Sequence, residues 1–454
     1  MIMIKPKRLP LSAKKYHHYI NINICTSIFI ISLVTIFNAQ GSEQDDVWIV
    51  NARIHTMTNT GIVEGHIRVR DGIIKDITSQ KPPVGISDSN RIDAQGRPVT
   101  PGLFDSGSMI GLLEVDLSTS AKDQVYKGES MSASFDVAMA FNEDSSLIPI
   151  YRNEGISHAF VRPGPGTSPL AGLGSVVQLS QNRRPGSPKA IVQSGNAVFV
   201  YLGERGRNLA SESRTAALQI LLSGLREAKL YDDHPVAYRY RQLREFELLQ
   251  EDLAALAEVL KRKKKLVLHI DRASEIRNVL QTLDTYELDI VLSGAAEAWK
   301  VADELAKRNI PVIINVLNNI PANFDRMGSR LDQAALLQKA GVRFAFMTDD
   351  LFTETRLLTQ AAGVAVAYGL AWRDALKAIT IQPAAIWGLS DRLGSLEEGK
   401  EAHLVIWSGD PFELSTTVDA MMIHGNWMDL NTRQIQLKDR YLDIDKSAPP
   451  MGYR

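Results

Sequence analysis

Short apolar runs alternate with helical stretches from Pro101 to about Pro383, and this alternation constrains the fold more than any other feature. The clearest apolar runs are residues 266–270, 289–292, 311–315 and 342–346. Strands that are apolar on both faces and separated by helices form a parallel sheet that is covered on both sides. About seven or eight such units predict an α/β fold with a TIM-type (β/α)8 barrel, because no glycine-rich phosphate-binding turn suggests an open sheet.

Two β-rich segments flank the barrel segment. Residues 42–98 contain short alternating strands, with a hairpin signal at Asp71-Gly72. The pattern returns to strands in residues 386–432. We therefore expect the two segments to pair into one small composite β-sandwich, with the barrel, residues 99–385, inserted between its halves.

The charge pattern favours a small-molecule partner over a nucleic acid. The formal net charge is −1 over 454 residues, so no large basic surface is expected. The basic run at residues 261–265 is interpreted as the solvated end of a helix, where positive charge is favourable. Residues 433–454 are polar and proline-bearing, and we expect them to form a loose tail.

The first 41 residues have the pattern of a signal peptide. A basic stretch precedes an uncharged apolar run at residues 20–37, and small residues follow at Ala39 and Gly41. This predicts an exported protein, in the periplasm after cleavage and without stable insertion in the membrane. An uncleaved anchor is the alternative, because the run approaches the ~20 residues that span a bilayer. Cys25 is the only cysteine, so cleavage would leave no thiol for disulfides, zinc ligation or catalysis.

The order of motifs along the chain resembles the amidohydrolase superfamily, in particular its imidazolonepropionase-like and Xaa-Pro dipeptidase-like exported members. Residues 99–105 are similar to the family's hydrophobic-x-Pro-Gly-Leu-Ile-Asp strand. A strand with His269 and a later strand ending at Thr348-Asp349 follow. Residues 394–402 then resemble the family's Gly-x-Leu-x-x-Gly-Lys-x-Ala motif. The resemblance covers nearly the whole mature chain and implies the same barrel.

The resemblance also implies a metal site at the carboxyl ends of the barrel strands. Family members bind one or two divalent ions through a His-x-His pair, a carboxylated lysine in some members, two later histidines and an aspartate. The two histidines of the pair share one face of their strand, since side chains two apart point the same way. The metal activates a water, and the aspartate accepts its proton.

Most of these ligands are missing from this chain. The His-x-His positions hold Gly107 and Met109, which are not ligands for such an ion. No lysine occurs in residues 197–202, and Ser293 stands near the place of the second later histidine. The aspartate after the Gly-Lys-x-Ala motif is replaced by His403, at a position that we interpret as structural.

Two residues match the family's site. His269 corresponds to a metal histidine, and Asp349 corresponds to the catalytic aspartate, which also binds metal. Of the other barrel histidines, His158 begins its strand and should lie at the opposite rim, while His234 lies in a loop or helix. His269 and Asp349 fall short of the three protein ligands typical of catalytic zinc. We therefore expect at most one divalent metal ion, or none.

Three further residues are candidates for binding a substrate: Glu297, Arg162 and Glu114. Arg162 precedes a Pro-Gly-Pro-Gly loop that could hold an anion, although a plain loop is the alternative. Glu297 has the alternative of a carboxylate in the first turn of a helix. Glu114, Asp116 and Glu297 would also provide oxygen ligands for another ion.

Two functions remain open from the sequence. The first is a hydrolase of cyclic amides or similar carbon–nitrogen bonds with a reduced or altered metal site, in which Asp349 is the base and His269 a ligand or electrophile. The second is a catalytically silent homologue that binds a small molecule or a partner at the barrel mouth, since a fold does not determine a function. A homo-oligomer is compatible with both.

Overall fold

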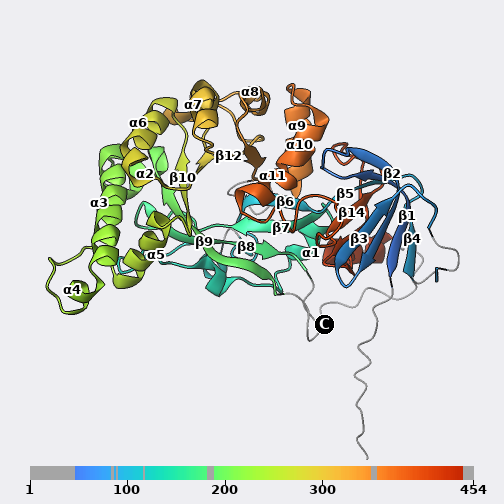
Figure 1. Cartoon of the computed structure of the whole chain (residues 1–454), viewed down its shortest axis with the longest axis horizontal. Helices are drawn as coiled ribbons and strands as arrows, with labels where there is room; N and C mark the ends of the chain where they lie inside the picture. The colour runs from blue at the N-terminus through green and yellow to red at the C-terminus, as the bar shows by residue number, and fades with distance from the viewer. Residues whose placement is uncertain are drawn as a thin grey trace, which may run out of the picture. The chain divides into compact units, whose positions relative to one another are not determined.

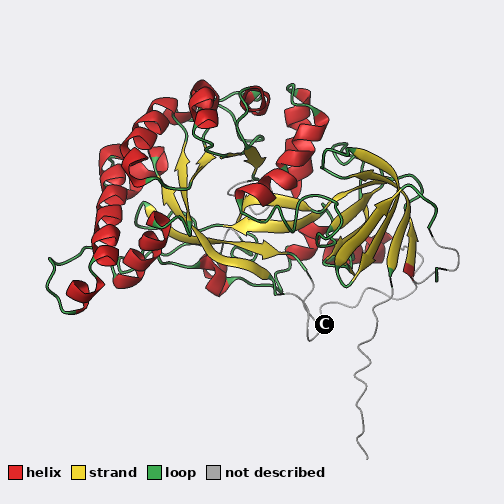
Figure 2. Ribbon diagram, in the orientation of Figure 1, coloured by secondary structure: helices red, strands yellow, loops and turns green. Residues whose placement is uncertain are grey.

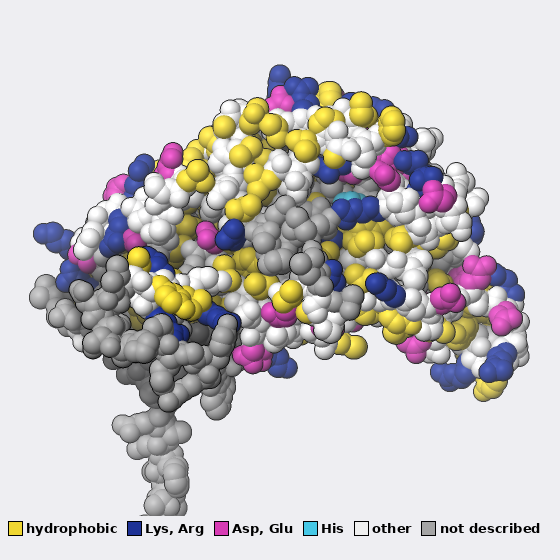
Figure 3. Space-filling view, turned by 180° about the vertical axis from the view of Figure 1, so that it is seen from behind, with side chains coloured by type: hydrophobic (Ala, Val, Ile, Leu, Met, Phe, Trp, Pro, Cys, Tyr) yellow, Lys and Arg dark blue, Asp and Glu magenta, His cyan; other side chains and the backbone are white. Residues whose placement is uncertain are grey.

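A computed structural model describes residues 46–82, 86–87, 90–115, 118–180, 189–348 and 355–442. The predicted signal peptide, Asp116, Asp349 and the end of the predicted tail lie outside these residues. Within the described ranges, no helix combines the length and the apolar character needed to cross a membrane. On the face drawn in Figure 3, basic and acidic side chains are interspersed.

Eight strands form the barrel sheet, in the spatial order β13-β12-β11-β10-β9-β8-β7-β6. They are β6 (Leu103–Ser108), β7 (Ile156–Val161), β8 (Leu170–Gln178), β9 (Ile191–Tyr201), β10 (Lys265–Ile270), β11 (Ile290–Gly294), β12 (Val312–Ile314) and β13 (Phe344–Phe346). Neighbouring strands from β9 to β13 are parallel, and so are β6 and β7. The predicted α/β fold with a TIM-type barrel is confirmed.

Strand β8 departs from the prediction, because it runs antiparallel to both β7 and β9. A uniformly parallel sheet was therefore the wrong expectation at this strand. The connection from β7 to β8 consists of residues 162–169, which are too few for the crossover helix that a parallel pair requires. Pro163 and Pro165 in this connection also disfavour a helix.

Helices follow the parallel strands and lie outside them, as Figure 1 shows for α3, α6 and α7. The larger helices are α2 (Gly203–Leu209), α3 (Arg214–Asp233), α5 (Gln250–Leu260), α6 (Ala273–Leu283), α7 (Ala302–Lys307), α8 (Gln333–Lys339), α9 (Leu358–Ala367), α10 (Trp372–Ala378) and α11 (Ile381–Ile386). Shorter helices are α1 (Ile148–Arg152) and α4 (Pro235–Arg239). In α6 the buried residues Ile276, Val279, Leu280 and Leu283 recur at helical spacing, so one apolar stripe covers the strands.

The barrel interior is packed with side chains. Phe104, Phe160, Phe199 and Met347 belong to one buried cluster that also includes Trp387, next to helix α11. Phe160 stacks on Trp387 with ring centroids 3.7 Å apart. The barrel therefore has a solid core, as small barrels of this type do.

The first and last barrel strands are joined by a side-chain contact. Thr348, after β13, donates its hydroxyl to Oδ2 of Asp105 in β6 at 2.5 Å. The other carboxylate oxygen of Asp105 accepts the N–H of Gly107 at 3.0 Å. Asp105 thus links the two edges of the barrel sheet from a fully buried position.

A second eight-stranded sheet combines both ends of the described chain (Figure 2). Its strands are β1 (Val47–His55), β2 (Ile62–Arg70), β3 (Ile73–Thr78), β4 (Arg91–Asp93), β5 (Pro98–Pro101), β14 (Leu404–Trp407), β15 (Val418–Ile423) and β16 (Asn426–Trp427). The antiparallel pair of β5 and β14 joins the N-terminal and C-terminal strands. The exact boundaries of the predicted domains stay predictions.

Two histidines of this sheet are buried. His55 is 5% exposed, and its ring lies 4.9 Å from that of Trp372. His66 is 8% exposed, and its Nδ1 accepts the N–H of Asn51. Helix α12 (Arg433–Leu442) lies in the predicted tail and buries none of its residues.

Candidate functional site

A cavity of about 220 Å³ opens at the carboxyl ends of strands β9 to β13. Active sites of TIM-type barrels are built at this end of the strands. Polar and charged residues make up most of the lining: Glu204, Arg205, Asn208, His269, Asp271, Asn315, Asn323 and Arg326. Its remaining walls come from Leu202, Gly203, Ile270, Gly294 and Met347.

His269 is the predicted site residue that the structure places in this cavity. It lies at the end of β10, is 6% exposed, and its ring is 5.3 Å from that of Tyr201. Asp271, two residues later, also lines the cavity, and its Oδ1 accepts the N–H of Ala296. Burial raises the pKa of the Asp271 carboxyl, so this group holds a proton more readily than an exposed aspartate.

The His-x-His position on β6 is filled by a methionine from the other edge of the sheet. A Cβ atom placed on Gly107 would lie 2.9 Å from Sδ and 3.1 Å from Cβ of Met347. Ser293, near a second ligand position, donates its hydroxyl to the same sulfur at 3.7 Å. Met347 is 1% exposed. Its thioether therefore takes the space in which the first histidine of the pair would lie.

A tyrosine in the segment where the family's lysine would lie is paired with an arginine that follows β7. Tyr201, at the end of β9, accepts a hydrogen bond from Nη1 of Arg162 at 2.7 Å and donates one to the Pro163 carbonyl. Arg162 is 1% exposed, with its guanidinium 5.6 Å from the Phe199 ring. Burial raises the pKa of Asp105, and the positive charge of Arg162 acts in the opposite direction. Arg162 thus provides a buried cation inside the barrel.

The described part of the barrel mouth does not fit the superfamily's metal ion. Catalytic zinc needs three protein ligands of the histidine, cysteine or carboxylate type. Among the described residues, a group of three such side chains close enough to share an ion occurs only at Glu401, His403 and His424. That group belongs to the composite sheet and its connections, so His269 has no set of described partner ligands at the mouth.

Two of the other predicted residues are engaged elsewhere. Glu297 accepts the N–H groups of Ala273 and Gly328 and pairs with Lys300, so it ties two loops together. Burial alone would raise the pKa of Glu297, but these hydrogen bonds lower it overall. Glu114 accepts a hydrogen bond from Asn142. Neither carboxylate lines the cavity.

Sequence reasoning missed several residues that line the cavity. Asp271 has a readable signal, because it stands two positions after His269 at the end of the same strand. Asn315 directly follows β12, so its position at a strand end was also a usable signal. Arg326 is far along the connection from β12 to α8, and nothing in its sequence context indicates that it returns to the mouth.

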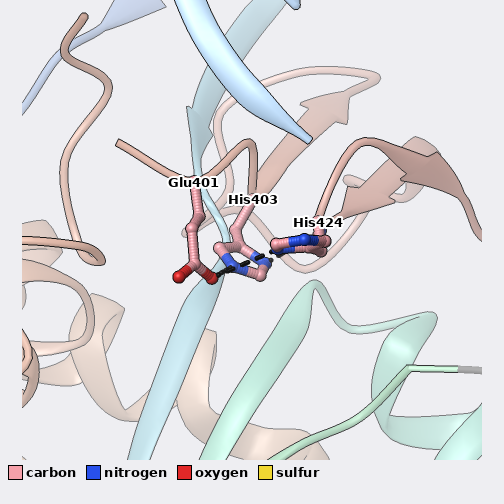
Figure 4. Close-up of side chains that lie close together, drawn as sticks. All are labelled: Glu401, His403 and His424. Atoms are coloured by element: carbon pink, nitrogen blue, oxygen red, sulfur yellow. Dashed lines mark hydrogen bonds and ion pairs between the residues drawn. The ribbon is translucent and has the colours of Figure 1, made fainter. Parts of the chain in front are cut away.

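Glu401, His403 and His424 form a compact cluster, drawn in Figure 4. Glu401 Oε2 lies 3.0 Å from His403 Nε2 and 3.3 Å from His424 Nδ1. Burial alone would raise the pKa of Glu401, but the hydrogen bonds from these histidines and from Arg392 hold it well below its usual range. His158, with a pKa strongly lowered by burial, lies 4.6 Å from the His403 ring, which places it away from the cavity residues, as predicted.

The hydrogen bonds of this cluster do not suit a metal ion. Nδ1 of His403 accepts the N–H of His424 at 3.2 Å, so the neutral ring carries its proton on Nε2 and donates it to Glu401. A histidine that binds metal through Nε2 instead donates from Nδ1. Arg392 already balances the charge of Glu401, at 2.6 Å. We therefore interpret the cluster as a hydrogen-bond network that connects three segments of the composite sheet.

Comparison with known proteins gives consistent matches. The model of the amidohydrolase family matches residues 254–428. An imidazolonepropionase of Mesorhizobium japonicum is 25% identical over 402 residues, which cover 81% of this chain and 93% of that protein. The amidohydrolase tasK of Hapsidospora irregularis is 20% identical over 399 residues, covering 80% of this chain but only 39% of that protein.

Solved structures agree with these relatives. An amidohydrolase from Thermotoga maritima is similar with a TM-score of 0.76 and 25% identity, over 84% of this chain and 99% of that one. A prolidase solved with N-methylphosphonate-L-proline shares the fold with a TM-score of 0.54 at 14% identity, over 85% of this chain. The barrel, the composite sheet, the order of motifs and these matches together place this chain in the amidohydrolase superfamily.

Proposed function

We propose that this chain binds a small molecule at the mouth of its amidohydrolase barrel, without the metal-dependent hydrolysis that the superfamily's ligand set performs. The observation that carries the proposal is the position of Met347, whose sulfur would lie 2.9 Å from a Cβ atom on Gly107. A histidine there would have to displace a buried side chain in a close-packed core. In this proposal, the replacement of the metal-binding histidine by Gly107 goes together with the packing of Met347 into the barrel interior.

A binding role is supported by what the mouth retains. The cavity at the strand ends is lined by polar groups from β9, β10 and β12 and the connections that follow them, an arrangement suited to orienting a small ligand. His269 and Asp271 provide a ring nitrogen and a carboxyl group there. Arg162 is buried inside the barrel, where its guanidinium bonds to the Tyr201 hydroxyl.

A hydrolase of carbon–nitrogen bonds with one divalent metal is the second candidate. Membership of the superfamily and the place of His269 in the cavity favour it. In this reading His269 would hold the ion together with Asp349, and Asp349 would accept the proton of the attacking water.

We also propose that the protein is exported, on the basis of the basic and apolar pattern in the first 41 residues. N-terminal sequencing of the protein recovered from the periplasm tests this. A mature chain that begins just after Gly41 is expected. An intact Met1 on protein from the cytoplasm would contradict it.

Metal analysis of the purified mature protein separates the two candidate functions. We expect far less than one zinc, manganese, iron or cobalt ion per chain, both in the wild type and in His269→Ala. One ion per chain that is lost in His269→Ala but retained in His424→Ala would overturn the binding proposal and support the hydrolase. The His424→Ala control excludes metal held by the cluster at Glu401.

A further inference from the structure

The cavity contains an arginine without a paired carboxylate. Among the described residues, Arg326 forms no ion pair, although it lines the cavity and is partly buried. Its neighbour Asp325 is already paired with Arg214 at 2.7 Å and Arg272 at 2.8 Å. A guanidinium held in a protein cavity is stabilised by a nearby anion, so we expect an anionic ligand beside Arg326.

Arg326 is fixed in place by the same turn that positions a second donor. Its Nη2 donates to the carbonyl of Asn318, whereas its Nε is buried without a hydrogen-bond partner. The N–H of Asn318 donates to Oδ1 of Asn315 at 3.1 Å. This leaves Nδ2 of Asn315, a residue 5% exposed, as a second buried donor without a partner. One turn thus presents two unsatisfied donors beside one cavity.

The segment that carries these donors is weakly packed. Ile320 is 51% exposed and Phe324 is 82% exposed, so its apolar side chains contribute little burial. Both donor nitrogens are buried without a hydrogen-bond partner, on residues that line the cavity. A ligand that supplies acceptors there would satisfy them, and unsatisfied buried donors are unfavourable.

The size and charge of the cavity restrict the class of ligand. A volume of about 220 Å³ is below the roughly 300–1,000 Å³ of sites for drug-sized molecules, so the ligand is a small metabolite. A neutral ligand would leave Arg326 without an ion pair, with the more distant charge of Asp271 acting on it. A dianion such as phosphate would meet Glu204 and Asp271, which also line the cavity. A ligand with a single carboxylate would pair with Arg326 and would bring less negative charge near Glu204 and Asp271 than a dianion.

We propose that the barrel mouth binds a small monocarboxylate, with Arg326 as its counter-ion and Asn315 as its second hydrogen-bond donor. This inference rests on the proposed function and specifies its ligand. It concerns a connection, residues 315–332, that supplies none of the superfamily's metal ligands identified in the sequence.

Matched acids and amides test the proposal on the mature wild-type protein. The probes are acetate against acetamide, N-acetylglycine against N-acetylglycinamide, and inorganic phosphate, each followed by thermal shift and titration calorimetry. We expect the two acids to bind and to raise the melting temperature, and the amides and phosphate to have no effect. Arg326→Gln and the near-isosteric Asn315→Asp should weaken binding of the acids about tenfold or more. Arg226→Gln, on the exposed face of α3, is the matched control and should bind like the wild type.

Three outcomes would overturn the inference. They are equal binding of acid and amide, binding of phosphate in preference to the acids, and no binding of any probe by a folded wild type. Equal binding of acid and amide would leave the proposed function standing, because a small molecule would still be bound. The proposed function is tested separately by metal analysis. One metal ion per chain that is lost in His269→Ala would overturn it.

Discussion

Gly107 and Met347 account for much of the difference between this barrel mouth and a metal site. The strand that begins the barrel keeps the family's motif up to Asp105, and the departure begins two residues later. Because Gly107 has no side chain, Met347 can cross from the other edge of the sheet and contact Ser293. We propose that the loss of the histidine pair and the position of the Met347 thioether are one coupled change in packing.

Restoring a histidine at Gly107 tests this coupling. We expect Gly107→His to lower the free energy of unfolding by about 1–3 kcal/mol, the usual effect of overpacking a buried site. Adding Met347→Ala should recover part of that loss, which urea unfolding of the two single variants and the double variant would measure. If the double variant lost the sum of the stabilities lost in the two single variants, the side chains at positions 107 and 347 would not compete for the same space.

His55 gives the stability of the protein a defined pH dependence. Burial lowers its pKa to about 4 from an ordinary value near 6.5. Below pH 6.5 the unfolded chain takes up a proton that the folded protein refuses until about pH 4, so stability is lost as the pH falls through this window. His55 accounts for at most about 3 kcal/mol of the free energy of unfolding that is lost over this pH window.

Urea unfolding at pH 7.5 and pH 5 measures this effect. The wild type should lose more stability between these values than His55→Gln, which cannot take up the proton. Identical pH dependence in the two proteins would rule out His55 as a contributor.

At the scale of elements, the sequence predicts which residues form helices and strands more clearly than it predicts the direction in which each strand runs. Helix α6 and strand β10 follow from periodicity alone, because each carries a clean apolar pattern. Strand β8 has the composition of a buried parallel strand, yet its short connection forces the opposite direction. Its apolar pattern could not reveal this, since both faces of β8 are buried in either direction.

In the candidate site too, some residues could be predicted from the sequence and others could not. His269 could be assigned from the sequence because strand ends form the mouth of a barrel. Arg326 could not, since its position depends on the path of a long connection and on a bond to the Asn318 carbonyl. Arg162 was expected beside a ligand loop, but its bond to Tyr201 holds it inside the barrel.

The Thr348 hydroxyl makes a buried hydrogen bond that links the end of β13 to Asp105 in β6. Thr348→Val removes the hydroxyl that Asp105 accepts and leaves a fully buried carboxylate short of a donor. We expect a loss of about 1–3 kcal/mol in the free energy of unfolding, as for other unsatisfied buried polar groups.

Thr380→Val is the matched control for this prediction. Thr380 is also fully buried, but its hydroxyl donates to a carbonyl within its own helical segment, so about 1 kcal/mol or less should be lost. Chemical unfolding of both variants makes the comparison. A larger loss in Thr380→Val would contradict the role given to Asp105 in closure.

At the scale of the whole molecule, the barrel and the composite sheet reproduce the superfamily's fold. The composite sheet and the barrel are joined by the antiparallel pair of β5 and β14, as the order of motifs implied. Inside the barrel, Arg162 is buried and its guanidinium bonds to Tyr201. The interior of this frame is filled by its own side chains.

Thermal unfolding of the purified protein with and without divalent metal tests whether the barrel mouth holds an ion. Calorimetry would compare the untreated protein, protein treated with a chelator, and treated protein supplied with zinc or manganese. We expect one melting temperature for all three samples. A melting temperature that falls with the chelator and recovers with metal in the wild type and in His424→Ala, but not in His269→Ala, would contradict it.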